Sequence, residues 1–69
     1  MLIDDIAEAG DRVTQLETEL RAAMGRRNLL VAEALANGER AMDIAITLSV
    51  TPARVYQMRD LARGRNDHR

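Results

Sequence analysis

The stretch GERAMDIAITLSVTPARVYQMRDLARG, residues 38–64, decides the fold. Its apolar residues recur at helical spacing in two runs, and the joint Leu48-Ser49-Val50 separates them. This pattern predicts two helices joined by a tight corner. We expect the first from about Arg40 to Leu48. Its inner side should consist of Ile44, Ala45 and Leu48.

The second helix has the clearer boundaries. Thr51 is suited to the N-cap, Pro52 to the first helical position and Gly64 to the residue after the last. We therefore predict a helix over residues 52–63. A projection at about 100° per residue gives it an apolar inner side. That side should consist of Thr51, Val55, Met58 and Ala62.

Upstream, apolar residues repeat from Leu2 to Ala23 at alternating spacings of four and three, which is a heptad pattern. It favours a coiled coil with a second copy of the chain. The predicted dimer interface consists of Leu2, Ile6, Ala9, Val13, Leu16 and Leu20. The flanking residues Arg12 and Glu17 would meet in a parallel pair, which favours that orientation without deciding it. Alternatively, the stripe packs against the rest of the same chain.

A further helix is predicted over residues 26–36, closed by Asn37-Gly38. Gly25 either ends the heptad helix or lies inside one continuous helix, because the stripe continues in phase at Leu30 and Ala34. The predicted fold is all-α: an N-terminal heptad helix followed by a three-helix unit. The corresponding domains are a dimerisation helix over 1–25, a unit over 26–64 and a flexible basic tail over 65–69.

Composition limits how this chain can be stabilised. A core built from 69 residues rarely supplies more than about 3–5 kcal/mol without a disulfide, a metal or self-association. The chain has no cysteine, and its one histidine, His68, stands near the end. Oligomerisation is therefore the expected supplement. No apolar run is long enough to span a bilayer, and the acidic start lacks a basic leader, so we expect a soluble cytoplasmic protein.

The charge is unevenly distributed. Residues 1–24 carry six acids and two arginines, whereas residues 25–69 carry eight arginines and five acids. All ten basic residues are arginine, which suits phosphate and guanine but also follows from a genome rich in G and C. The two halves are expected to have different roles.

Residues 27–63 resemble a helix-turn-helix DNA-binding unit, in particular that of the fourth region of sigma factors and of small phage and actinobacterial regulators. The resemblance rests on Gly38, Asp43-Ile44-Ala45, Leu48-Ser49-Val50-Thr51, Val55 and Tyr56-Gln57-Met58. The family usually has Glu, Gly and Ser where this chain has Asp43, Ser49 and Thr51. Ser49 would have to adopt a conformation that glycine takes freely. Arg40 stands where a Ser or Thr cap is customary.

The resemblance implies a role for each exposed residue of the second helix. Base contacts would come from Pro52, Ala53, Tyr56 and Gln57. Gln57 can pair with adenine N6 and N7. Phosphate contacts would come from Arg40, Arg54, Arg59 and Arg63. Asp60 would repel phosphate unless it accepts from cytosine N4 or orients Arg63.

The sequence therefore predicts a sequence-specific, double-stranded DNA-binding transcriptional regulator, most simply a repressor. As a homodimer it would read half-sites about one helical turn, or a multiple, apart. The alternative is a protein-interaction module that contacts RNA polymerase or another regulator. We expect no enzyme, cofactor, metal or small-molecule substrate, because nucleophile, phosphate-loop and metal-ligand motifs are lacking. Met42 and Ile46 are expected to be buried against the N-terminal helix or the second subunit.

Overall fold

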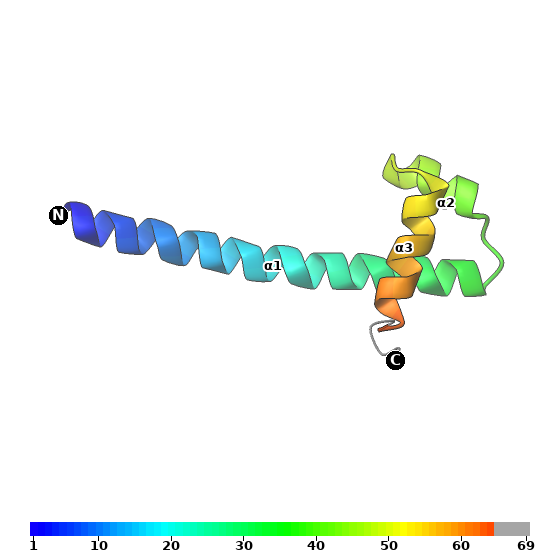
Figure 1. The fold of residues 1–69 in the computed structure, drawn as a ribbon, viewed down its shortest axis with the longest axis horizontal. Helices are drawn as coiled ribbons and strands as arrows, with labels where there is room; N and C mark the ends of the chain where they lie inside the picture. The colour runs from blue at the N-terminus through cyan, green and yellow to red at the C-terminus, as the bar shows by residue number, and fades with distance from the viewer. Residues whose placement is uncertain (65–69) are drawn as a thin grey trace.

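The computed structural model describes residues 1–64 and contains three helices: α1 (Leu2–Ala36), α2 (Ala41–Leu48) and α3 (Pro52–Ala62) (Figure 1). These residues include no strand, so the predicted all-α class is confirmed. α1 forms a long rod, α3 crosses its C-terminal part, and α2 packs mainly on α3. The molecule extends 55 Å along its longest axis. The predicted tail, residues 65–69, lies outside the described residues.

α1 continues through Gly25 without interruption. The segments 1–25 and 26–36 are therefore parts of one helix of 35 residues, and the described chain has three helices rather than the four expected. A glycine inside a helix costs only about 1 kcal/mol relative to alanine. That cost is too small to end a helix whose apolar stripe continues on both sides.

The end of α1 follows the prediction for Asn37-Gly38. Gly38 has φ +95°, which glycine adopts without strain. The Gly38 amide donates to the Leu35 carbonyl at 3.1 Å, and the Glu39 amide donates to the Ala34 carbonyl at 3.0 Å. These are the two bonds of a Schellman motif, so the last carbonyls of α1 have partners.

The corner between α2 and α3 uses the same motif with a serine in the glycine position. Ser49 has φ 60°, and the Val50 amide donates to the Ala45 carbonyl at 2.9 Å. The Thr51 hydroxyl then accepts from the Arg54 amide at 3.2 Å, which confirms the predicted N-cap of α3. At the other end of α2, the Arg40 side chain makes no capping bond.

The core lies where the three helices meet. Its buried members are Val31 of α1, Ala45 of α2, and Val55 and Met58 of α3. Val55 and Met58 are 0% and 1% exposed, so the predicted packing of α3 is confirmed. Ile44 and Leu48 are partly buried against this core, as expected for the inner side of α2. Thr51, predicted on the inner side of α3, is exposed.

The N-terminal part of α1 makes no contact that buries its apolar stripe. Every residue from 1 to 26 is exposed, including all six residues of the predicted interface. Figure 1 shows this segment projecting away from α2 and α3. The alternative that the stripe packs against its own chain is therefore wrong. These six apolar residues, which we call the seam, are accessible to another molecule.

Candidate nucleic-acid interface

The surface of α3 that faces away from the core carries the candidate residues. Because Val55 and Met58 point inward, the helical repeat turns the intervening residues outward. We define the outer surface of α3 as Ala53, Arg54, Tyr56 and Gln57, all of which are exposed. Pro52, the fourth predicted base contact, is half-buried at the start of the helix. Three of the four predicted base-contact residues are thus exposed.

Two side chains of the outer surface are joined by a hydrogen bond. Arg54 Nη1 donates to Gln57 Oε1 at 3.0 Å across one helical turn. Gln57 Oε1 has a second lone pair, and the Gln57 amide nitrogen has two hydrogens. The bond therefore orients the amide while its donors stay free for a ligand. This bond was not predicted from the sequence, although the spacing of three residues is a signal for it.

Tyr56, Arg59 and Asp60 form a second group on α3. The Arg59 guanidinium lies over the Tyr56 ring, 5.0 Å from its centroid. Arg59 Nε and Nη2 both donate to Asp60 Oδ1, at 3.2 and 3.1 Å. The sequence leaves two roles open for Asp60, acceptance from cytosine N4 and orientation of Arg63; its carboxylate instead pairs with the neighbouring Arg59. Asp60 thereby has a cationic partner before any ligand binds.

The four arginines predicted to contact phosphates differ in their exposure and in whether other side chains engage them. Arg54 and Arg63 are exposed at opposite ends of α3, and Arg40 is exposed just before α2. Arg59 is half-buried and engaged by Tyr56 and Asp60. Arg40, Arg54 and Arg63 are thus the exposed cations, whereas Arg59 first has to leave its partners.

A separate apolar surface lies on α2. Met42 and Ile46 are 52% and 70% exposed, so the expectation that they are buried against the N-terminal helix is wrong for the single chain. They lie one turn apart on the side of α2 opposite to Ile44. Burial by a second subunit is not tested by this structure.

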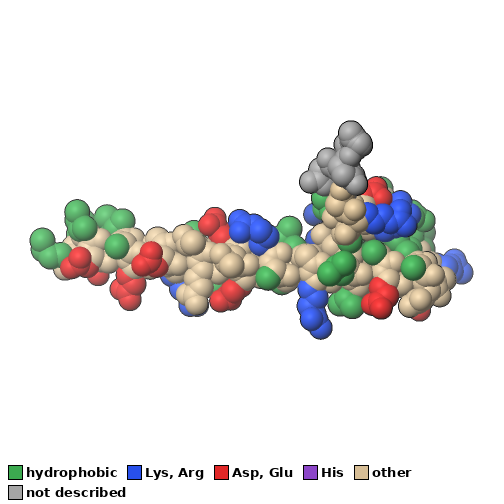
Figure 2. Space-filling view, turned by 90° about the horizontal axis from the view of Figure 1, so that it is seen from below, with side chains coloured by type: hydrophobic (Ala, Val, Ile, Leu, Met, Phe, Trp, Pro, Cys, Tyr) green, Lys and Arg blue, Asp and Glu red, His purple; other side chains and the backbone are tan. Residues whose placement is uncertain are grey.

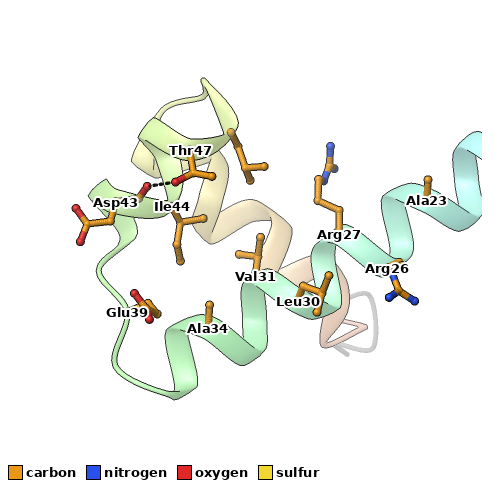
Figure 3. A pocket seen from close by; sticks show the side chains of 11 residues that line it. Ala23, Arg26, Arg27, Leu30, Val31, Ala34, Glu39, Asp43, Ile44 and Thr47 are labelled. Carbon is orange, nitrogen blue, oxygen red and sulfur yellow. Dashed lines mark hydrogen bonds between the residues drawn. The ribbon is translucent and has the colours of Figure 1, made fainter.

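A groove of about 480 Å³ opens between α1 and α2. Figure 3 shows Leu30, Val31 and Ala34 of α1 facing Ile44 and Thr47 of α2 across it. The Thr47 hydroxyl donates to the Asp43 carbonyl at 2.9 Å, so its polar atom is satisfied within α2. None of the residues of the outer surface of α3 lines this groove, and the two features are distinct.

Charge also differs along the rod. In Figure 2, apolar side chains cluster at the N-terminal tip of α1 and carboxylates flank them. The first eleven residues carry Asp4, Asp5, Glu8 and Asp11 and no arginine. No helix among residues 1–64 has the length and apolar character needed to cross a membrane.

Comparison with known proteins gives no assignment: no family model matches the chain, and neither the curated proteins nor the solved structures searched contain a match. The resemblance to sigma-type DNA-binding units therefore depends on the residues quoted above.

Proposed function

We propose that this chain is a sequence-specific, double-stranded DNA-binding transcriptional regulator that acts as a homodimer. In this proposal α2 and α3 form a helix-turn-helix, and α3 enters the major groove. The most direct mode of action is repression by occupying a promoter.

The observation that carries the proposal is the division of α3 into two sides. Val55 and Met58 are fully buried, whereas Ala53, Arg54, Tyr56 and Gln57 are exposed. A helix of 11 residues is about 16 Å long, and its diameter of about 10–12 Å with side chains fits a major groove about 12 Å wide. A rigid corner with Ser49 in the left-handed region holds that helix in place.

Gln57 supplies the sequence preference in this proposal. Its amide donates to N7 of adenine and accepts from N6, while Arg54 holds the carbonyl oxygen from the other side. Pro52, Ala53 and Tyr56 add apolar contact with base edges. Arg40, Arg54 and Arg63 bind phosphates, and Arg59 joins them on release from Asp60.

Dimerisation is supported by the exposed seam of α1. Six apolar residues at heptad positions have no partner within the described chain. The core holds only four buried apolar residues, so the chain gains more from association than a larger domain would.

The proposal is tested by gel retention of duplexes from a random pool, comparing Gln57→Ala with the matched control Gln15→Ala. Gln15 is an exposed glutamine on α1, away from the apolar seam. We expect Gln57→Ala to lose the preference for the selected sequence and Gln15→Ala to keep it, with unchanged circular dichroism for both. A wild-type protein without preference among duplexes at low salt would refute DNA recognition.

The exposed pair Met42 and Ile46 favours a second candidate, a protein-interaction module. Apolar side chains on an outer surface suit a protein partner such as RNA polymerase or another regulator. In that case Ile46→Asp abolishes binding to polymerase, whereas Gln57→Ala has no effect on it.

A further inference from the structure

We propose that two copies of the chain pair in an antiparallel orientation through residues 2–27 of α1, in one specific register. In this register Val13 faces Leu16 of the second copy, close to the two-fold axis. The argument uses only the exposed side chains of α1, so it goes beyond the proposed function and does not depend on it.

The first support is the filling of the seam. In the antiparallel register Ile6 meets Ala23 of the second copy, and Ala9 meets Leu20. Each small side chain thus faces a large one, as an evenly packed interface requires. A parallel pair would place Ala9 against Ala9, between layers of paired Ile6 and paired Val13. It would also place Ala23 against Ala23, next to a layer of paired Leu20. Layers of such unequal width leave gaps beside the alanines.

The second support is charge. One flank of the seam consists of Asp5, Arg12, Glu19 and Arg26. When the two helices run in opposite directions, this flank of one copy lies against the same flank of the other. Asp5 then faces Arg26 of the second copy, and Arg12 faces Glu19, so the two-fold axis produces four opposite-charge pairs. A parallel pair retains only the contact of Arg12 with Glu17. It also sets the acidic first turns of both chains side by side.

The same charges select the register. Sliding the second copy by one heptad in one direction brings Asp5 to Glu33 and Arg12 to Arg26. Sliding it by one heptad in the other direction brings Asp5 to Glu19 and Arg12 to Arg12 of the second copy. Both shifts replace every attractive pair on this flank with a repulsive one.

On the opposite flank, the proposed pairing accounts for two apolar residues that lie outside the core heptad positions, Ile3 and Met24. Ile3 is 73% and Met24 is 39% exposed in the single chain. In the proposed register Ile3 of one copy faces Met24 of the other, so both are covered. At the ends, Leu2 packs on the alkyl stem of Arg27, whose guanidinium is directed to Asn28 Oδ1 at 3.1 Å. A parallel pair would instead oppose two Arg27 side chains.

The pairing also fixes where the two α3 helices lie. α3 covers α1 at Asn28 and Val31, which lie about 100° around the helix from the seam. An antiparallel two-fold axis runs perpendicular to the rod, so both α3 helices lie on the same side of the dimer. A parallel two-fold axis would place them on opposite sides.

The distance between the two α3 helices bears on the DNA sites, and this step rests on the proposed function. At a rise of about 1.5 Å per residue, the two copies of Val31 are about 50 Å apart along the rod. This is about one and a half turns of B-DNA, whose major groove returns to one face every 34–36 Å or so. The two α3 helices of one dimer therefore cannot both enter the major groove on the same face of a straight duplex. The preferred sequence should be a single motif rather than an inverted repeat at one-turn spacing.

Disulfide trapping tests the pairing directly, because the natural chain contains no cysteine. We would mix Ile6→Cys with Ala23→Cys under equilibrium oxidation, without DNA, and identify the products by mass. The mixed disulfide should dominate. Each variant alone should give little product, because its two copies lie about 26 Å apart, far beyond disulfide reach. As the register control, Ile6→Cys with Leu30→Cys should not link, since these residues are offset by about 11 Å.

Exchange of charges gives a second measurement. Asp5→Arg and Arg26→Asp should each weaken association about tenfold in sedimentation equilibrium, and the double variant should recover most of that loss. Self-linking of Ile6→Cys would overturn the proposal in favour of parallel pairing. A link between positions 6 and 30, or a monomeric wild-type protein, would also overturn it. Trapping in a protein that binds no duplex would leave the pairing intact and remove only the DNA function.

Discussion

Replacing Met58 by alanine should remove much of the stability of the unit that presents the outer surface of α3. Met58 is 1% exposed and is one of four buried apolar residues. The change removes three heavy atoms beyond Cβ, at about 0.8 kcal/mol each. It thus costs about 2.4 kcal/mol before any cavity term, and the usual range for such changes is about 2–5 kcal/mol. A domain of this size holds only about 3–5 kcal/mol in its core.

Amide hydrogen exchange of α3 measures this loss, because α1 dominates the helical signal in circular dichroism. A loss of about 2.4 kcal/mol corresponds to a fall of about 50-fold in the protection of α3 amides. Leu61→Ala is the matched control, since Leu61 is on the same helix and is 53% exposed. It should change protection by less than about threefold. Equal effects of the two variants, at one protein concentration, would refute the packing of α3 described above.

Three further predictions concern the corner and the outer surface. Ser49→Gly should raise stability by about 1 kcal/mol, because glycine tolerates φ 60°; Ser49→Ala should give no such gain in thermal unfolding. Thr51→Ala should lower stability by about 1 kcal/mol through loss of the bond to the Arg54 amide, whereas Thr51→Ser should restore most of it. Arg63→Ala should weaken duplex binding evenly across sequences and reduce the log–log salt slope by about 1, whereas Gln57→Ala should cost about 1–3 kcal/mol at one base pair only. An unchanged salt slope for Arg63→Ala would show that this arginine does not contact phosphate.

The helix limits near the corner could be predicted because strong local signals define them. Asn37-Gly38 ends α1, and Thr51-Pro52 begins α3, each through a backbone geometry that few other residues supply. The predicted limits of α2 and α3 differ from the observed ones by one residue at most. The burial of Val55 and Met58 followed from helical periodicity alone.

Other features could not be predicted, because weak terms of similar size compete. Gly25 destabilises the helix by about 1 kcal/mol relative to alanine, which is similar to the stabilisation from one good contact. Local signals therefore did not decide whether α1 continues. Asp60 has an arginine next to it and another three residues on, and its carboxylate pairs with Arg59. Ile46 is exposed because it lies on the side of α2 opposite to Ile44, which faces α1. Heptad periodicity does not describe what covers that side.

The continuity of α1 connects assembly to the proposed binding surface. Residues 2–26 are all exposed in the single chain, and an isolated helix in water is marginally stable. In the proposed dimer, pairing through the seam supplies the stabilisation that the first half of α1 lacks. The same helix carries Val31, on which α3 packs, with no turn between the seam and this contact. In the proposed dimer, the register of the seam therefore determines the separation and direction of the two α3 helices. We expect a change in the seam to alter the arrangement of the proposed binding surfaces.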